Sequence, residues 1–302
     1  MRPQDWIHIA PGAEPQLRRL GLDTVESALR CRAGRFAAMS STSDTLEVLP
    51  PDGEPDAPSV YLKRYRYPTW SRRLKGMFRG ALFRQSRAWF EYNRLSALRR
   101  QGVPCVEPLA VGERREAGFV TACMLITRGV PGQSLLSFAQ SRTPVAPADR
   151  RRIIETLARQ VRRMHDAGLV HGSLAWRDVL IRREENGGFA FAFLDPQRVR
   201  LYRLRGCRRL GFLHDVATLA ATAMLVCSRA DRLRFARAYF CRKRLNRHHR
   251  RWMNAVARRA QPLVARERHR MEVNKIFVDP GAVQSKSVRG GPHVHSEQEF
   301  EM

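Results

Sequence analysis

The chain has 302 residues, of which 43% are hydrophobic, and carries a formal net charge of +27 at pH 7. This length suffices for one large core or for two lobes. The longest apolar run, residues 216–227, is shorter than the roughly 20 residues of a membrane span and contains two threonines, so it indicates a buried helix. Since the N-terminus lacks an apolar signal core, we expect residence in the cytoplasm.

The positive charge predicts attraction to anionic surfaces: nucleic acid, acidic lipid headgroups or a phosphorylated glycolipid. Arginine dominates over lysine, and its guanidinium suits bidentate contact with phosphate. A GC-rich genome also favours arginine, so charge alone leaves the class of partner open.

Alternating apolar positions and Gly/Pro punctuation predict five strands in the first half of the chain, at residues 35–39, 45–49, 59–65, 108–111 and 119–127. One helix interrupts them at residues 86–100 and stops at a Gly-Val-Pro sequence. Ahead of the strands, residues 1–30 are expected to form a short helical lead-in.

The second half of the chain reads as mainly helical. Residues 147–168 place apolar side chains on one helical face, and residues 212–272 continue in helical pattern. Between them, residues 179–183 and 189–194 predict a hairpin around a Gly-Gly turn. We therefore expect a lead-in at 1–30, an N-lobe at 31–128, a C-lobe at 129–275 and a disordered tail at 276–302, which is an α+β bilobal arrangement hinged near residues 128–132.

Two segments have the spacing of a kinase catalytic loop followed by a metal-binding strand end. They read His-Gly-Ser-Leu-Ala-Trp-Arg-Asp-Val-Leu-Ile at 171–181 and Phe-Leu-Asp-Pro-Gln at 193–197. Transfer of phosphate from ATP needs a cation on the phosphates, a set of metal ligands, and a group that orients the acceptor hydroxyl.

Four charged residues supply these parts in the order that a kinase requires. Lys63 is placed to contact the α- and β-phosphates of ATP, and Glu91 on the next helix to hold that lysine. Asp178 and Asp195 are candidate ligands of Mg²⁺, which prefers oxygen. Taken singly, each residue also fits a solvated surface charge or a turn former. Their order and spacing favour one shared site.

The chain resembles the lipopolysaccharide kinase family, whose members phosphorylate heptose or Kdo sugars of the lipopolysaccharide core and share the protein-kinase-like fold. The resemblance covers roughly residues 35–240 and is carried by Val60-Tyr-Leu-Lys-Arg-Tyr65, Ser86-Arg-Ala-Trp-Phe-Glu-Tyr92, Gly102-Val-Pro-Cys-Val-Glu-Pro108, Leu125-Ile-Thr-Arg128, Leu169-Val-His-Gly-Ser-Leu174 and His214-Asp-Val-Ala-Thr-Leu219. It implies a small N-terminal sheet lobe, a larger helical C-terminal lobe, and use of ATP and Mg²⁺. It also implies that Asp215 braces the catalytic loop through hydrogen bonds.

The catalytic positions depart from the family pattern. Ser173 stands where the catalytic aspartate is expected, and a serine cannot accept a proton at neutral pH as a carboxylate does. His171 keeps the preceding histidine, for which a packed, hydrogen-bonded role is favoured over proton transfer. The chain has no G-x-G-x-x-G motif, and Gly34 is the one glycine placed for a phosphate-covering turn.

The segment between Asp195 and Asp215 lacks the Ala-Pro-Glu motif of protein kinases, which indicates an acceptor other than protein. It holds six arginines, which form either a solvated basic loop or a cradle for a phosphorylated sugar: Arg198, Arg200, Arg203, Arg205, Arg208 and Arg209.

Three functions compete. The first is phosphorylation of a sugar hydroxyl on an anionic glycolipid, with possible peripheral contact with the anionic inner face of the inner membrane. The second is a pseudokinase, a binding or regulatory module without phosphate transfer. The third, less favoured, is nucleic-acid binding by residues 229–270, which hold fifteen Arg or Lys and two acids. The aromatic residues interleaved there fit the core face of a helix better than a base-stacking platform.

Overall fold

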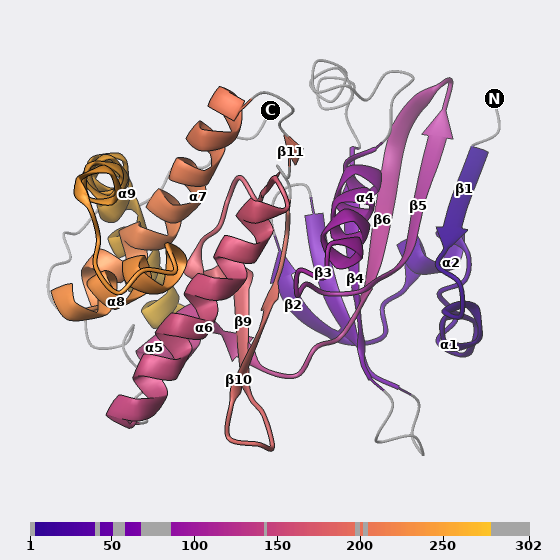
Figure 1. The fold of residues 1–302 in the computed structure, drawn as a ribbon. Helices are drawn as coiled ribbons and strands as arrows, with labels where there is room; N and C mark the ends of the chain where they lie inside the picture. Colours follow the sequence, from indigo (N-terminus) through magenta and orange to yellow (C-terminus); the bar gives the residue numbers. More distant parts are fainter. Residues whose placement is uncertain are drawn as a thin grey trace, which may run out of the picture.

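The computed structural model describes residues 4–39, 43–50, 58–67, 86–141, 144–196, 200–201 and 205–278. A sheet lobe and a helical lobe lie side by side (Figure 1), which confirms the α+β bilobal architecture. The expected tail beyond residue 278 and most of the basic segment 64–87 lie outside the described residues.

The N-terminal lobe is built on a six-stranded antiparallel sheet of order β1-β5-β6-β4-β3-β2. The β5–β6 hairpin turns at Ala117 and Gly118, whose φ angles of 48° and 82° match the type of turn that follows the twist of the strands. The strands are β1 (Gln4–Ile9), β2 (Arg35–Met39), β3 (Ser43–Val48), β4 (Val60–Arg66), β5 (Pro108–Glu116) and β6 (Phe119–Arg128).

The lead-in differs from its prediction, because it begins with a strand. Residues 4–9 form β1 and pair with β5 at the edge of the sheet, and only then come the helices α1 (Glu14–Arg19) and α2 (Val25–Arg30). Ile7 and Ile9 face a core formed under these two helices. This short alternation of apolar residues is the signal that the sequence reading missed.

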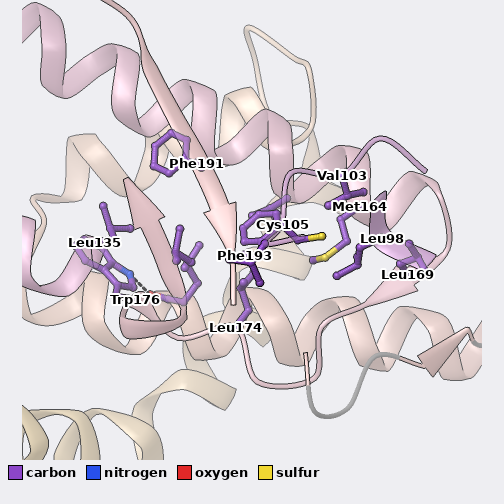
Figure 2. Packing of buried hydrophobic residues seen from close by; sticks show 14 of the residues in the cluster. Leu98, Val103, Cys105, Leu135, Met164, Leu169, Leu174, Trp176, Phe191 and Phe193 are labelled. Carbon is purple, nitrogen blue, oxygen red and sulfur yellow. Dashed lines mark hydrogen bonds between the residues drawn. The ribbon is translucent and has the colours of Figure 1, made fainter. Parts of the chain in front are cut away.

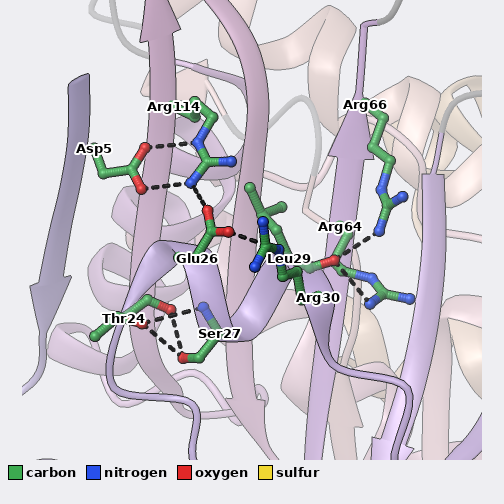
Figure 3. Close-up of polar contacts among 9 residues, drawn as sticks. All are labelled: Asp5, Thr24, Glu26, Ser27, Leu29, Arg30, Arg64, Arg66 and Arg114. Atoms are coloured by element: carbon green, nitrogen blue, oxygen red, sulfur yellow. Dashed lines mark hydrogen bonds and ion pairs between the residues drawn. The ribbon is translucent and has the colours of Figure 1, made fainter. Parts of the chain in front are cut away.

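Helix α2 is tied to the sheet by buried and half-buried charges (Figure 3). Arg114 of β5 pairs with Asp5 of β1 at 2.7 Å and also with Glu26 of α2. The carbonyl of Leu29 accepts hydrogen bonds from Arg64 and from a neighbouring arginine of β4. The lead-in is therefore an integral layer on one face of the sheet.

The opposite face of the sheet carries α4 (Arg87–Arg100), which begins at a cap where the Ser86 hydroxyl accepts from the amide of Trp89. The edge strand β1 also reaches this helix. The ring of Trp6 lies 4.6 Å from that of Trp89, and His8 Nε2 lies 3.0 Å from the Tyr92 hydroxyl. Helix α4 is thus held by β1 as well as by β5 and β6.

The two lobes share one core, part of which is drawn in Figure 2. The loop after α4 lies against the strand β10 (Phe189–Phe193) of the C-terminal lobe. The Phe193 amide donates to the Pro104 carbonyl at 3.0 Å, and the Val106 amide donates to the Phe193 carbonyl at 3.4 Å. This contact fixes the chain two residues before Asp195.

The C-terminal lobe contains the predicted helices and hairpin. The long α7 carries a stretch, Arg208–Val226, that is long and apolar enough to cross a membrane by length and composition, a test that buried helices of globular proteins also pass. Here Val216, Ala217 and Leu219 of α7 are buried in the core. The helices are α5 (Leu135–Gln140), α6 (Pro147–Asp166), α7 (Arg205–Val226), α8 (Arg229–Tyr239) and α9 (Arg247–Val278).

The aromatic side chains of α8 and α9 contact one another. The ring of Tyr239 lies 5.4 Å from that of Trp252 and 5.1 Å from that of Phe240, and it stacks on Phe235. Tyr239 is buried and its hydroxyl bonds His165 of α6 at 2.8 Å. These rings join helices, as expected for core positions, and form no exposed platform for nucleic-acid bases.

Because α1 contributes to a core, shortening one of its buried side chains should destabilise the sheet lobe. We expect Leu17→Ala, at a fully buried position, to lower the free energy of unfolding by about 2–5 kcal/mol. Chemical denaturation measures this, with Leu49→Ala, at a position 62% exposed, as a control that changes stability by less than about 0.5 kcal/mol. Equal effects of the two substitutions would contradict an integral lead-in.

Candidate active site

The catalytic-loop candidate runs between two strands and is anchored by its own backbone. It leaves β8 (Leu169–Val170), forms a short 3-10 turn at Trp176–Asp178 and enters β9 (Val179–Arg183). The Leu194 amide donates to the Asp178 carbonyl at 2.8 Å. Hence the two kinase-like segments, described here at residues 171–181 and 193–196, lie against each other.

Asp215 of α7 braces this loop from below. Its side chain is fully buried and accepts two hydrogen bonds at 2.7 Å, from the amides of His171 and Gly172. Gly172 adopts a φ of 79°, which glycine tolerates without strain. His165 lies 3.3 Å from the same carboxylate. The position and bonding are those that the family resemblance implies for Asp215.

His171 is fully buried, and its Nε2 donates to the Leu194 carbonyl at 2.9 Å. Since a carbonyl only accepts, Nδ1 is the unprotonated nitrogen, and it has no partner among the described residues. Burial lowers the pKa of His171, which keeps the ring neutral. This histidine holds the backbone just before Asp195.

Lys63 joins the two lobes at the centre of the site. Its Nζ lies 3.0 Å from Glu91 Oε1 on α4 and 2.9 Å from Asp195 Oδ1 after β10. The Tyr65 hydroxyl, two residues along β4, donates to Glu91 Oε2 at 2.7 Å. Glu91 is buried, and Asp195 keeps about a third of its side chain exposed.

The charged groups of this trio shift one another's pKa. Burial alone would lower the pKa of Lys63, but the carboxylates of Glu91 and Asp195 outweigh it and raise that pKa, so the ammonium stays charged. Burial raises the pKa of Glu91, and Lys63 opposes this rise. One ammonium thus contacts both carboxylates, one from each lobe.

Asp178 lies near this trio with little compensation for its charge. Burial raises the pKa of Asp178 to about 7, and repulsion by Asp195 adds to the rise. The ion pair that Asp178 makes among the described residues is with Arg177, whose Nε lies 3.9 Å from Asp178 Oδ1. A half-buried carboxyl with so distant an ion-pair partner would suit a divalent cation as a ligand.

The residues present fit magnesium better than a transition metal. The described part of the chain holds no group of three or more His, Cys, Asp or Glu side chains placed to bind a metal. Mg²⁺ is commonly bound by one or two carboxylates together with substrate phosphates and water. Asp178 and Asp195 would provide such a pair.

Two positions depart from an ordinary kinase site. Ser173 is half-buried and places a hydroxyl, without a carboxylate, where the catalytic aspartate is expected. Gly34 lies just before β2, where an added Cβ would meet the Glu47 carbonyl at 2.3 Å. Gly34 thus allows close packing of β2 on β3, whereas the residues that connect the two strands, 40–42, lie outside the described residues.

Two contributors were not found from the sequence. Tyr65 could have been, because it follows Lys63 by two residues and shares its face of β4. Glu267 of α9, which pairs with Arg177 of the catalytic loop, could not, since 90 residues separate the two.

The two lobes and the order of their elements are those of a protein-kinase-like fold. A family model described as the lipopolysaccharide kinase (Kdo/WaaP) family matches residues 53–239, more than half of the chain, so the chain belongs to that family. Membership implies kinase chemistry on lipopolysaccharide and the use of ATP.

A solved structure described as WaaP in complex with acyl carrier protein is similar to this chain, with a TM-score of 0.60 and 22% identity over 87% of this chain and 99% of that chain. At this identity the likeness supports the fold alone. No curated protein matches the sequence.

The raised pKa of Asp178 predicts a pH-dependent stability. The folded state binds the Asp178 proton more tightly than the unfolded chain, whose carboxyl titrates near 4, so ionisation costs stability as pH rises from about 4 to about 7. We expect Asp178→Asn to be more stable than wild type by roughly 2–4 kcal/mol at pH 8 and by less at pH 5. Chemical denaturation without metal measures this, and an equal difference at both pH values would contradict it.

Proposed function

We propose that the protein transfers the γ-phosphate of ATP, with Mg²⁺, to a sugar hydroxyl of an anionic glycolipid. The observation that carries the proposal is the convergence of Lys63, Glu91 and Asp195 between the lobes. Family membership supports the reaction class, and the geometry supports a nucleotide site at this convergence.

Each residue has a role that its surroundings favour. Lys63 contacts the α- and β-phosphates, and Glu91 keeps its ammonium in place, with Tyr65 as a second support. Asp195 and Asp178 would hold Mg²⁺, which neutralises charge on the phosphates when bound. Burial otherwise penalises the charge of Asp178, whose pKa it raises to about 7.

The transfer breaks the bond between the γ-phosphorus and the bridging oxygen of ATP, and forms a bond from that phosphorus to the sugar oxygen. The hydroxyl proton must leave, and at position 173 there is no carboxylate to take it. His171 is fully buried, and burial lowers its pKa, so it is unsuited to replace the base. Positioning and electrostatics remain as sources of rate.

Ser173 also supports a second candidate, a pseudokinase that binds nucleotide without turnover. The two functions share the nucleotide site and differ in whether the acceptor proton has an outlet. The contacts of Asp215 and Lys63 are the same under both.

The acceptor side of the proposal depends on positive charge. Of the six arginines between Asp195 and Asp215, the structure describes the side chains of Arg208 and Arg209. On the same lobe, residues 242–251 hold six exposed Arg or Lys and no acid. A groove of about 590 Å³ nearby is lined by Arg251, Asn254, Ala257 and Arg258. This surface suits an anionic membrane face, and we propose a cytoplasmic, peripheral location at the inner membrane.

ATP turnover by purified protein with lipopolysaccharide-core acceptors tests the reaction. We expect Asp195→Ala to lower turnover by at least about 100-fold, because the metal and phosphate contacts are lost. Asp166→Ala, which removes an exposed carboxylate of α6, is the matched control and should leave turnover unchanged. Nucleotide-induced thermal stabilisation without any turnover would instead support the pseudokinase.

Restoring the missing carboxylate distinguishes the two candidates further. If the site lacks only its base, Ser173→Asp should raise turnover by roughly 10²–10⁴-fold. A single-turnover assay with radiolabelled ATP measures this change. An unaltered rate in a variant that binds nucleotide as wild type does would show that position 173 is not where the acceptor proton leaves.

Binding to vesicles tests the membrane surface. Each basic residue near an anionic bilayer contributes about 1 kcal/mol, so replacing Arg242, Lys243 and Arg244 by alanine should weaken binding to phosphatidylglycerol vesicles roughly 100-fold. The affinity should also fall with salt. Cosedimentation measures both effects.

The control for this test is a triple alanine variant at Arg18, Arg159 and Arg162, whose guanidiniums already pair with acids. It removes the same charge from other surfaces and should change binding much less. Equal loss in both variants would reduce the effect to net charge and would contradict a defined membrane face.

A further inference from the structure

The C-terminal helix α9 contacts the catalytic loop through one buried acid. Both carboxylate oxygens of Glu267 lie 3.3 Å from Nη1 of Arg177, and Arg270 holds the same acid from the other side at 2.7 Å. Glu267 is only 5% exposed. Helix α9 lies beyond residue 239, outside the residues that the family model matches.

Arg177 stands between two carboxylates. It precedes Asp178 in the chain, and its Nε is 3.9 Å from Asp178 Oδ1, whereas its Nη1 is turned to Glu267. A guanidinium that met Asp178 in bidentate geometry would occupy the oxygens that a metal needs. The pairing with Glu267 draws the arginine away from that geometry.

Packing alone does not account for the acid. The neighbouring apolar residues of α9, including Val256, Ala260 and Leu263, already attach the helix to the shared core. A buried ion pair adds little stability over an apolar pair of the same volume, because both charges must be desolvated. A role in directing Arg177 is therefore the more economical account of Glu267.

We propose that Glu267 is a positioning residue which holds Arg177 off the Asp178 carboxylate and so keeps that carboxylate open to a divalent cation. The inference rests on the proposed function in so far as Asp178 is a metal ligand. Glu267 itself contacts neither the metal nor the nucleotide, and acts through Arg177.

Metal binding by the full chain tests this directly, with no need for turnover. Mn²⁺ serves as the probe, and the loss of its free paramagnetic resonance signal is titrated in the presence of a non-hydrolysable ATP analogue. Glu267→Gln keeps the shape but removes the charge that holds Arg177, and should weaken Mn²⁺ binding roughly tenfold.

A double variant separates positioning from mere structure. Adding Arg177→Ala to Glu267→Gln removes the competing cation and should restore Mn²⁺ affinity to within about twofold of wild type. Arg270→Ala, which removes the other partner of Glu267 but no neighbour of Asp178, should bind Mn²⁺ like wild type. Thermal unfolding of each variant reports its folding.

Each other outcome overturns the inference. If the double variant binds as weakly as Glu267→Gln, the acid acts through the structure of α9 and not through Arg177. If wild type and Glu267→Gln bind Mn²⁺ equally, the inference fails while the proposed function stands; if wild type binds none, both fail. Should Glu267→Gln not fold, Arg177→Ala alone decides, since it must bind Mn²⁺ at least as tightly as wild type.

Discussion

The ammonium of Lys63 is the point on which the rest of the site depends. It holds Glu91 from a helix of one lobe and Asp195 from a strand end of the other, both at hydrogen-bond distance. Removing the partner of a buried carboxylate lowers the free energy of unfolding by several kcal/mol. The trio therefore links the two lobes, and each lobe must hold its carboxylate within hydrogen-bond distance of Lys63.

Contacts between uncharged groups hold the two carboxylates in place. Glu91 lies on a helix that packs on the sheet, where the rings of Trp6 and His8 on the edge strand contact Trp89. Asp195 follows a strand whose end bonds the loop after α4, and the carbonyl just before it is held by His171. Because these supports come from backbone pairing and apolar packing, the charges meet in a preformed arrangement.

Sequence patterns predicted the central residues and the bracing by Asp215, but not the supports that come from β1 and α9. Lys63, Asp178 and Asp195 lie in local motifs, where a few neighbouring residues show the strand or loop context. Strand β1 escaped because its alternation spans only four residues, and its role appears only when β5 pairs with it. The pairing of Arg177 with an acid of α9 leaves no local pattern at all, since it depends on the tertiary fold.

The catalytic loop carries its carboxylate at a different position from that of protein kinases. Where kinases carry an aspartate and, five residues later, an asparagine, this chain carries Ser173 and Asp178. The loop keeps one acid, at the position proposed to bind Mg²⁺, where burial penalises its charge and where Asp195 repels it. Compared with the kinase pattern, this loop has an additional negative charge at position 178 and lacks a carboxylate at position 173 to take the proton of the sugar hydroxyl. Under the proposed function, binding of a metal nucleotide and chemical transfer are therefore separable properties, and Ser173 bears on the second.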